Sequence, residues 1–527
     1  MNFNVKNSFV EVLPKDSLSE NIPRIVEKAC YSHVSPTKTS EPEIVHVSEE
    51  MANDIGFKKD EIKSPEFLKV FTGNKVMKDI EPYAMCYGGH QFGSWSGQLG
   101  DGRAINLFEI ICDAKRWAVQ LKGAGKTPYS RGGDGRAVLR SSIREYLGAE
   151  AMHNLGIPST RSLSLALTGD LVKRDMFYNG NIQFEKGAIV TRLSPSFLRF
   201  GSYEIFTKRN DLVTLKILVD YTINNFFPSI DLSANSSYLL FFQKVVESTL
   251  KLITNWLRVG FVHGVMNTDN MSILGLTMDY GPFGWMDEFD ENWTPNWSDF
   301  NSRRYSYQNQ IKNGFWNLAR FGESLLPLIK DKRAVEEILE EYQTNQKKIH
   351  LKMIKSKIGL YDENEKDEIL VKNLIAVLQL TEIDFTIFFR NLSKCGKNTG
   401  EVERNHIISA FNFIKEAFYA PSELKGEVMD KWYNWFWNYL LRLQKEDVPD
   451  NIRRIRMNNF NPKYILRNYM TQIAINHAEQ GDYSLIEELY SLLMKPYDEQ
   501  VKFQKWFKKG PDWARKRVGY SILSCSS

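Results

Sequence analysis

The stretch that most limits what this chain can fold into is residues 263–281, HGVMNTDNMSILGLTMDYG. It follows residues 238–261, where apolar side chains recur at helical spacing: Leu239, Phe242, Val246, Leu250, Ile253 and Leu257. The pattern predicts a long helix, then a polar loop that carries Asp269 and Asn270, then a short apolar run that ends at Asp279. A helix, a polar loop and an acidic turn are therefore expected in that order.

The same order of parts forms the catalytic half of a protein kinase, in which the loop reads H-R-D-x-x-x-x-N and D-F-G follows. Aligned through Asn270, the H-R-D triplet becomes His263, Gly264 and Val265. The residue that would take a proton from a substrate hydroxyl is therefore a valine, whereas the metal-binding Asn270 and Asp279 are present. The alternative is an ordinary helix, turn and buried strand with solvent-facing polar residues.

Glycine becomes dense between residues 87 and 103, in YGGHQFG and then GQLGDGR. The β-branched and alternating apolar residues of 104–112 and 117–121 predict two strands directly afterwards. A glycine-rich turn lets backbone N–H groups approach phosphates, and the guanidinium of Arg103 can bind phosphate oxygens in bidentate fashion. Most glycine-rich hairpins are only turns, but Arg103 favours a phosphate site.

The second strand ends at Lys122, where a kinase has the lysine of its third strand. A second glycine-rich, basic loop follows, GAGKTPYSRGGDGR, and a helix is predicted from Ala137 to about Asn154. On that helix Glu145 is the candidate partner for Lys122. Either residue alone is more simply explained as a surface side chain, but together, in kinase order, they favour an ion pair.

The rest of the chain predicts one more strand and then mainly helices. Residues 189–193 read as a strand that leads to Arg192 and Arg199, two arginines that either bind an anion or lie on the surface. From Asp211 the pattern is helical, and almost all of 315–504 is amphipathic. The aromatic cluster at 432–437 is expected in a core rather than in base stacking.

These elements predict an α+β, protein-kinase-like two-lobed fold with an extended helical C-terminal region. The expected parts are an irregular N-terminal wrap at 1–80 with one helix near 48–55, an N-lobe with the glycine-rich loops at 81–205, a C-lobe with the catalytic loop at 206–320, and a helical extension with a cysteine tail at 321–527.

Composition excludes several classes of protein. The chain has 527 residues, 43% hydrophobic and 25% charged, which is typical of a globular protein. Its net charge of +4 requires neither nucleic acid nor a membrane surface, and no apolar run spans a bilayer. Five cysteines without metal-site spacing suit a reducing compartment. Without a secretory or transit signal, cytoplasm is the expected location and mitochondria are less favoured.

Several long motifs resemble one known family. YGGHQFGSWSGQLGDGRA, LKGAGKTPYSRGGDGRAVLRSSIREYLGAEAM, HGVMNTDNM, MDYGPFGWMDEFD, NPKYILRNYMTQIAI and the near-terminal SCSS are similar to the selenoprotein O family, from about Pro23 to the last residue. The resemblance implies a kinase-like fold without the H-R-D aspartate. It also implies transfer of AMP from ATP to Ser, Thr or Tyr hydroxyls of protein substrates, with release of pyrophosphate and with the nucleotide bound in a flipped orientation.

The resemblance also implies roles for individual residues. Asp269 would accept the proton, and Lys122, paired with Glu145, would hold phosphates. Mg²⁺, with Mn²⁺ as the alternative, would be bound by Asn270 and Asp279. The residues expected to contact ATP, each of the type found in the family, are Gly100, Gly102, Arg103, Lys122, Asp134, Gly135, Arg192, Arg199 and Asp279.

The C-terminal tail departs from the family pattern. Cys525 stands where some members have selenocysteine, and residues 273–306 contain no cysteine to which the tail could be bonded. After the helix-breaking run at 508–511 we expect a mobile, exposed tail with Cys525 as a free thiol, available to a redox partner.

Two other functions compete with AMP transfer. One is an atypical protein kinase that uses Asp269 as a displaced base, and the other is a catalytically inactive, nucleotide-binding pseudokinase scaffold. The presence of both metal ligands, Asn270 and Asp279, disfavours the scaffold, which needs neither.

Overall fold

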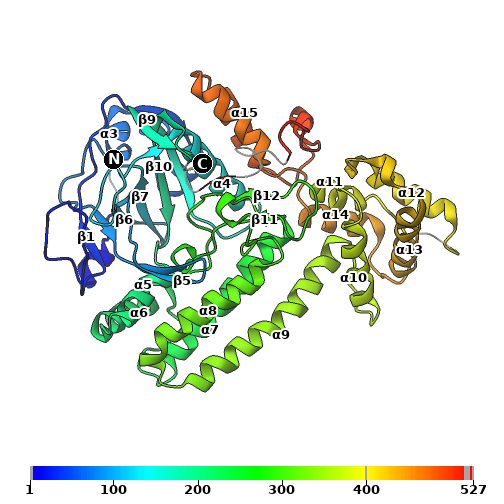
Figure 1. The fold of residues 1–527 in the computed structure, drawn as a ribbon, viewed down its shortest axis with the longest axis horizontal. Helices are drawn as coiled ribbons and strands as arrows, with labels where there is room; N and C mark the ends of the chain where they lie inside the picture. The colour runs from blue at the N-terminus through cyan, green and yellow to red at the C-terminus, as the bar shows by residue number, and fades with distance from the viewer. Residues whose placement is uncertain (1–3, 177–178, 398–399, 516–522, 525–527) are drawn as a thin grey trace.

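An antiparallel sheet forms the N-terminal part of the computed structural model, which describes residues 4–176, 179–397, 400–515 and 523–524 (Figure 1). Within these residues the strand order is β1 (Tyr31–His33), β3 (Tyr83–Met85), β6 (Ala104–Cys112), β7 (Lys115–Lys122), β10 (Ile182–Ser194), β9 (Arg161–Asp175) and β2 (Glu43–Val47), with β8 (Ala137–Val138) paired to β10. β4 (Gly88–Gln91) and β5 (Ser94–Gln98) form a separate hairpin. β11 (Phe261–Val262) and β12 (Gly284–Trp285) form another two-stranded sheet, on either side of the loop that carries Asp269 and Asn270.

The two strands predicted after the glycine-rich turn are confirmed as β6 and β7. They pair from Ala104 opposite Lys122 to Cys112 opposite Lys115, and their apolar side chains are buried. The predicted strand at 189–193 is the inner end of β10, whose long partner β9 the sequence analysis did not predict. On its other side β10 pairs with β7, where Arg192 lies opposite Gln120, so Arg192 and Lys122 come to neighbouring positions of the sheet.

The prediction of an irregular N-terminal segment is wrong at two places, where the structure has strands. β1 pairs with β3 and β2 pairs with β9, so these two strands form the edges of the sheet. These strands are short, and each pairs with a neighbour on one side only. The surrounding prolines also interrupt the alternation of apolar and polar residues that would predict a strand. The predicted helix near 48–55 is confirmed as α2 (Glu49–Asp54), capped by Ser48, whose Oγ accepts a hydrogen bond from Met51 N at 3.1 Å.

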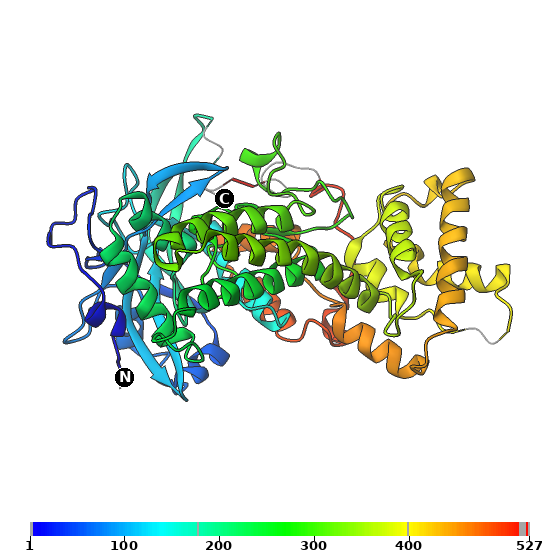
Figure 2. The same ribbon diagram turned by 90° about the horizontal axis from the view of Figure 1, so that it is seen from below.

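Helices pack against the sheet and continue away from it (Figures 1 and 2). The predicted helix after the second glycine loop is α4 (Leu139–Asn154), preceded by the two residues of β8. The long amphipathic helix before the catalytic loop is α7 (Ser237–Arg258). The other helices before residue 360 are α1 (Ser8–Val12), α3 (Pro65–Phe71), α5 (Phe200–Lys208), α6 (Leu212–Phe226), α8 (Gln310–Ile329) and α9 (Lys332–Lys357).

The remaining helices form a second hydrophobic core and a return to the first. α10 (Asp367–Leu378), α11 (Phe385–Leu392), α12 (Arg404–Ile414), α13 (Gly426–Leu443) and α14 (Asp450–Phe460) surround the second core, at the right of Figure 2. α15 (Asn468–Glu479) and α16 (Ser484–Leu493) then come back to pack on α4. None of the described helices is long and apolar enough to cross a membrane.

The aromatic cluster of α13 lies in the second core, as predicted, with one exception. Trp432, Trp435 and Phe436 are buried, whereas Trp437 is 42% exposed. The helical period explains the difference. Each residue of a helix is turned by about 100° from the one before it, and this turn carries position 437 off the buried face.

The expectation of a mobile, exposed tail is wrong for the two described residues at the chain's end. Leu523 and Ser524 are buried. Leu523 N donates to Pro295 O and Trp297 N donates to Leu523 O, both at 2.7 Å, while Ser524 Oγ donates to Met176 O. Backbone pairing of this kind has no side-chain signature in the sequence. Cys525 lies outside the described residues; Cys30, Cys86, Cys112 and Cys395 are free thiols.

Candidate functional site

A cavity of about 770 Å³ lies where the glycine-rich loops, the end of β7 and the segment after α7 meet. Nine of the predicted site residues line it: Gly100, Gly102, Arg103, Lys122, Asp134, Gly135, Arg192, Asn270 and Asp279. Glu145, Arg199 and Asp269 do not line it. Glu145 contacts Lys122 and Arg199 contacts Asp279, both of which do line it, whereas Asp269 contacts Arg199 through its backbone oxygen. The fold therefore brings the predicted residues of both halves of the chain to one place.

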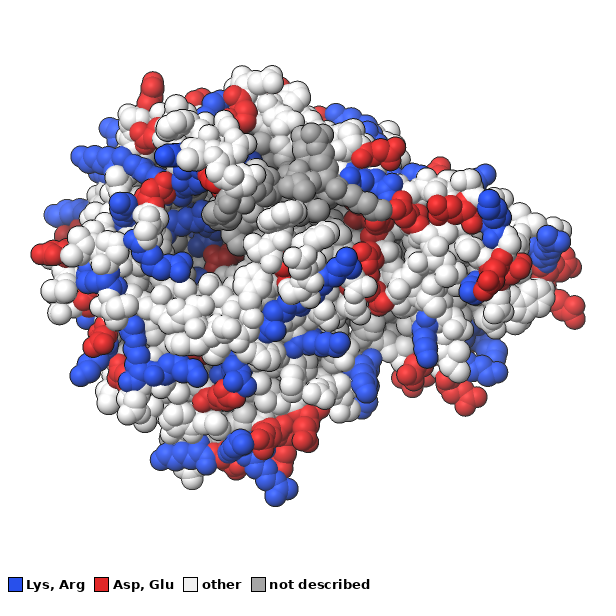
Figure 3. All heavy atoms as spheres, viewed as in Figure 1, with Lys and Arg blue, Asp and Glu red and all other residues white. Residues whose placement is uncertain are grey.

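The lining of this cavity is strongly cationic. Seven of its side chains are basic: Arg103, Lys122, Arg131, Arg136, Lys173, Arg174 and Arg192. Only three are acidic: Asp101, Asp134 and Asp279. Figure 3 shows Lys and Arg side chains gathered around a hollow over the sheet. An excess of cations around a concave site favours a polyanionic ligand such as a nucleotide phosphate chain.

The predicted ion pair between β7 and α4 is present. Lys122 Nζ lies 2.6 Å from Glu145 Oε2, and both side chains are almost fully buried. Burial lowers the pKa of Lys122 to about 8, and the charges of Arg192 and Arg103 act in the same direction, against the raising effect of Glu145. Glu145 Oε1 also accepts a hydrogen bond from Arg192 Nη1 at 2.9 Å, so a single carboxylate positions two cations of the cavity.

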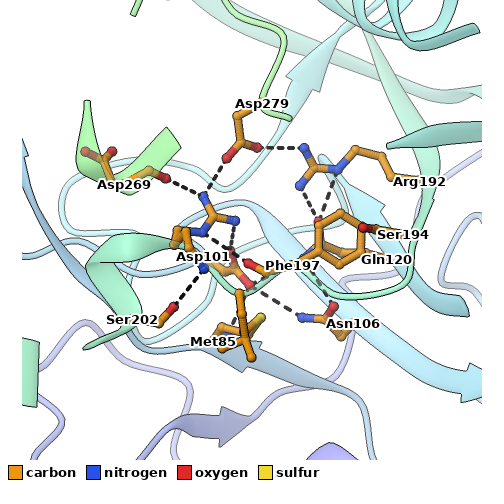
Figure 4. Close-up of polar contacts among 12 residues, drawn as sticks. Met85, Asp101, Asn106, Gln120, Arg192, Ser194, Phe197, Ser202, Asp269 and Asp279 are labelled. Carbon is orange, nitrogen blue, oxygen red and sulfur yellow. Dashed lines mark hydrogen bonds and ion pairs between the residues drawn. The ribbon is translucent and has the colours of Figure 1, made fainter. Parts of the chain in front are cut away.

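Asp279 is held by two arginines (Figure 4). Arg192 Nη1 donates to its Oδ1 at 2.7 Å, and Arg199 Nη1 donates to its Oδ2. Burial alone would raise the pKa of Asp279, but Arg199, Arg192 and Lys122 hold it far below its usual range. The residue has φ of 56°, in the left-handed region that non-glycine residues rarely occupy. The carboxylate is thus anionic and fixed at the wall of the cavity.

Arg199 occupies a fully enclosed position. It is 1% exposed, its Nη1 also donates to the Asp269 backbone oxygen at 2.8 Å, and its guanidinium lies 4.2 Å from the centre of the Tyr87 ring. Its Nη2 is 3.8 Å from Asp101 Oδ1. In this arrangement Arg199 reaches the cavity through Asp279 and not directly.

Asp269 is buried against the β4–β5 hairpin. Its Oδ2 accepts a hydrogen bond from Gln91 Nε2 at 3.2 Å. A Cβ on Gly89 would lie 2.8 Å from Asp269 Oδ1, so only glycine leaves room for this side chain. Burial raises the pKa of Asp269 to about 7, although Gln91 and Arg199 lower it. A carboxylate with that pKa can exchange a proton near neutral pH.

A chain of buried polar contacts holds the hairpin on the loop of Asp269. His90 N donates to Thr268 Oγ1 at 2.7 Å, and Thr268 Oγ1 donates to Glu204 Oε2 at 2.8 Å. His90 Nδ1 lies 3.1 Å from the same Glu204 oxygen. The glycine-rich stretch that precedes the nucleotide loop therefore positions the candidate base rather than the phosphates.

Two glycines of the cavity loops are required by close approach. Gly100 has φ of 73°, and a Cβ there would lie 2.3 Å from the Tyr129 ring. Gly135 has φ of 71°, and a Cβ there would lie 2.1 Å from Gly125 O. The neighbouring Asp134 is exposed and bound to Arg174, with Nη1 at 2.7 Å. The two loops are thus packed together with backbone turned toward the cavity.

The oxygen ligands present fit a hard cation that is shared with phosphates. Asn270 Nδ2 donates to Val265 O at 2.9 Å, which leaves Oδ1 of the amide as an acceptor in the cavity that Asp279 also lines. No group of three or more His, Cys, Asp or Glu among the described residues could hold a metal alone. Mg²⁺ is commonly bound by one or two protein oxygens together with water and substrate phosphates, so these residues suit it.

Sequence reasoning missed several residues of the lining. Arg131 and Arg136 stand in the second glycine loop, where their charge gave a usable signal. Lys173 and Arg174 come from β9, which the alternation SLSLALT at 162–168 could have revealed. Asp101 had no such signal. It is buried and accepts hydrogen bonds from Met85 N at 3.0 Å and from Asn106 and Gln120 at 3.4 Å (Figure 4).

Comparison with known proteins agrees with this geometry. Residues 20–494 match the family model described as protein adenylyltransferase SelO. The protein nucleotidyltransferase YdiU of Flavobacterium johnsoniae is 53% identical over all of both chains, and that of Aromatoleum aromaticum is 47% identical over the same share. The protein of that name from Rhodopirellula baltica is 46% identical, covering 99% of this chain and 98% of its own. The chain belongs to the SelO family of protein adenylyltransferases.

Proposed function

We propose that this protein transfers AMP from ATP to hydroxyl groups of Ser, Thr or Tyr in protein substrates and releases pyrophosphate. Family membership over nearly the whole chain supports nucleotidyl transfer to protein. The observation that carries the finer proposal is a cation-rich cavity that contains Lys122 and Asp279, with Val265 where a kinase has its base.

The proposed step needs little covalent help from the protein. The substrate oxygen bonds to the α-phosphorus, the bond between that phosphorus and the bridging oxygen to the β-phosphate breaks, and the hydroxyl proton passes to Asp269. Since the raised pKa of Asp269 is about 7, the carboxylate accepts that proton near neutral pH. Positioning and neutralisation of charge supply most of the rate enhancement for such a reaction.

The cationic side chains would bind the phosphate chain. In a flipped orientation, the β- and γ-phosphates face Lys122 and Arg192, with Arg103, Arg131 and Arg136 available at the loops. Mg²⁺ bound through Asn270 and Asp279 would neutralise phosphate charge. For Arg199 to contact a phosphate, its guanidinium must leave Asp279, which we propose happens when phosphate charge compensates the loss.

A protein kinase is the nearest competing function, because the same residues bind ATP in both. The number of cations favours AMP transfer. Beyond the lysine and the metal ligands that a kinase uses, this cavity adds six arginine and lysine side chains around the phosphate position. An inactive scaffold is disfavoured, since it requires neither a lysine–glutamate pair nor two metal ligands.

Parallel labelling separates the three functions. A protein substrate is incubated with Mg²⁺ and ATP labelled at the α- or at the γ-phosphate. We expect α-label in protein without γ-label, together with released pyrophosphate. γ-Label without α-label would establish a kinase, and the absence of both would favour the scaffold.

The variant that tests the site is Asp279→Ala, which should incorporate no label because it removes the carboxylate oxygens from the proposed metal site. Lys122→Ala should be nearly as inactive. Exchange of the exposed Lys347 for alanine, far along α9, should leave labelling unchanged. Normal labelling by Asp279→Ala would contradict the site assignment.

A further inference from the structure

A second cationic cavity lies in the C-terminal helical region, with a volume of about 650 Å³. It is formed by α11, α14 and the segments around residues 463 and 499–509, and it shares no lining residue with the nucleotide cavity. Its lining includes Lys463, which belongs to NPKYILRNYMTQIAI, a family motif that the nucleotide cavity leaves unused. The cavity is therefore separate from the proposed nucleotide site.

Six lining side chains carry positive charge, against two carboxylates. The cations are Arg390, Lys394, Arg454, Lys463, Lys508 and Lys509, and the carboxylates are Glu416 and Glu499. Glu499 binds both Arg390, at 2.8 Å, and Lys463, at 2.6 Å. Lys394, Arg454 and Lys508 are exposed and make no ion pair with a carboxylate of the described residues. Several charges thus remain uncompensated around one hollow.

Two of the cations are rigidly held inside the protein. Lys463 is 6% exposed, and its Nζ also donates to Gln504 Oε1 at 2.7 Å. Arg390 is 5% exposed and donates to the backbone oxygens of Asn458 and Tyr497 at 2.8 and 3.0 Å. A buried cation is costly unless it has anionic partners, and here two of them share one carboxylate. Nearby, the buried Nδ2 of Asn391 has no hydrogen-bond partner in the described part of the chain.

We propose that this cavity binds a compact polyanion, a small molecule that carries two or more phosphate groups. Its volume lies within the range of small-molecule sites. Phosphate oxygens accept several charge-assisted hydrogen bonds from Lys and Arg at once. An extended acidic peptide fits less well, because carboxylates on one side of a strand are spaced about 7 Å apart.

The test is calorimetric titration of the full chain with inorganic tripolyphosphate, at fixed ionic strength. The wild type is compared with Lys394→Glu/Lys508→Glu, which reverses two exposed charges of the cavity. The matched control is Lys347→Glu/Lys348→Glu, which makes the same change in net charge on the exposed face of α9. The nucleotide cavity is unaltered in all three proteins, so its own binding of the probe is common to them.

We expect two classes of site in the wild type and in the control, and the loss of one class, or an affinity at least about tenfold lower, in the cavity variant. Arg454→Gln should weaken the same class to a smaller degree. Identical titrations of wild type and cavity variant would overturn the proposal, and so would an equal loss in the control. Displacement of the probe by a poly-glutamate peptide at equal charge would reject the small-molecule assignment in favour of an acidic protein segment.

Discussion

At the scale of the residue, the three carboxylates of the candidate site differ in the charges that surround them. Glu145 and Asp279 each face cations at short range, and the neighbouring arginines keep Asp279 anionic. Asp269 has only Gln91 as a side-chain partner among the described residues, so burial dominates and its pKa rises to about 7. One carboxylate is thus suited to proton transfer and the other two to holding cations.

This difference predicts the pH dependence of transfer. Because Asp269 must be deprotonated to accept a proton, the rate should be full above pH 7 and fall as pH decreases through about 7. Replacing Gln91 by alanine removes a hydrogen bond that favours the charged form. The acidic limb should therefore move to higher pH, by roughly half a unit to one unit. Initial rates of α-label incorporation between pH 5.5 and 9 measure the shift.

Gln183→Ala is the control for this measurement, because Gln183 is exposed on β10. A limb that stays in place, or moves toward lower pH, in Gln91→Ala would show that another group controls the rate.

At the scale of the element, the β4–β5 hairpin positions the loop of Asp269, a role that its glycine pattern did not predict. Its residues lie on the loop of Asp269, and a Cβ on Gly89 would lie 2.8 Å from Asp269 Oδ1. Gly89→Ala places a methyl group against the Asp269 carboxylate, which must then shift. A displacement of about 1 Å at a reacting group costs up to about a hundredfold in rate. We expect transfer to fall by ten- to a hundredfold.

The control is Ser94→Ala, an exposed position on the other strand of the same hairpin. Nucleotide binding, followed by fluorescence of a labelled ATP, should be nearly unchanged in Gly89→Ala, since Gly89 does not line the cavity. Loss of binding equal to the loss of rate would place the hairpin in the nucleotide site instead.

The elements that could be predicted from sequence are those with a strong period or a unique motif. β6, β7, α4 and α7 have apolar patterns of many residues. Lys122 ends β7, Glu145 lies within α4, and Asn270 stands in the loop that follows α7. The strands β1 and β2 and the pairing of Leu523 could not be predicted, because backbone hydrogen bonds to a distant segment determine them. The double contact of Asp279 with Arg192 and Arg199 likewise depends on tertiary positions.

At the scale of the whole molecule, residues 46–48 in the N-terminal part of the chain are bound to residues 487–490 in its C-terminal part. Ser48 and Tyr490 share a buried hydrogen bond of 2.8 Å between their hydroxyl oxygens, and His46 Nε2 lies 2.8 Å from Glu487 Oε2. α16 thus fastens the N-terminal edge of the sheet as well as α4. α16 is therefore part of the same packed unit as the sheet and α4, the helix that carries Glu145.

Tyr490→Phe should lower the free energy of unfolding by about 1 kcal/mol, the usual contribution of one hydrogen bond, because Ser48 loses a partner in the interior. Urea unfolding followed by tryptophan fluorescence measures the change. Tyr483→Phe, at a partly exposed position on the same side of the molecule, is the control and should change stability by less. Equal effects of the two substitutions would mean that the hydrogen bond contributes nothing.

The link between Ser48 and Tyr490 also has a consequence for how the protein is made. A ribosome adds about 5–20 residues per second, so the partner of Ser48 is synthesised roughly 20 to 90 seconds after Ser48 itself. During that interval α4 lacks the helices that cover it, and its apolar side chains remain accessible. We expect the edge of the sheet at β2 to gain its contacts with α16 only after residue 490 has been synthesised, which gives chaperones that bind nascent chains time to act on α4.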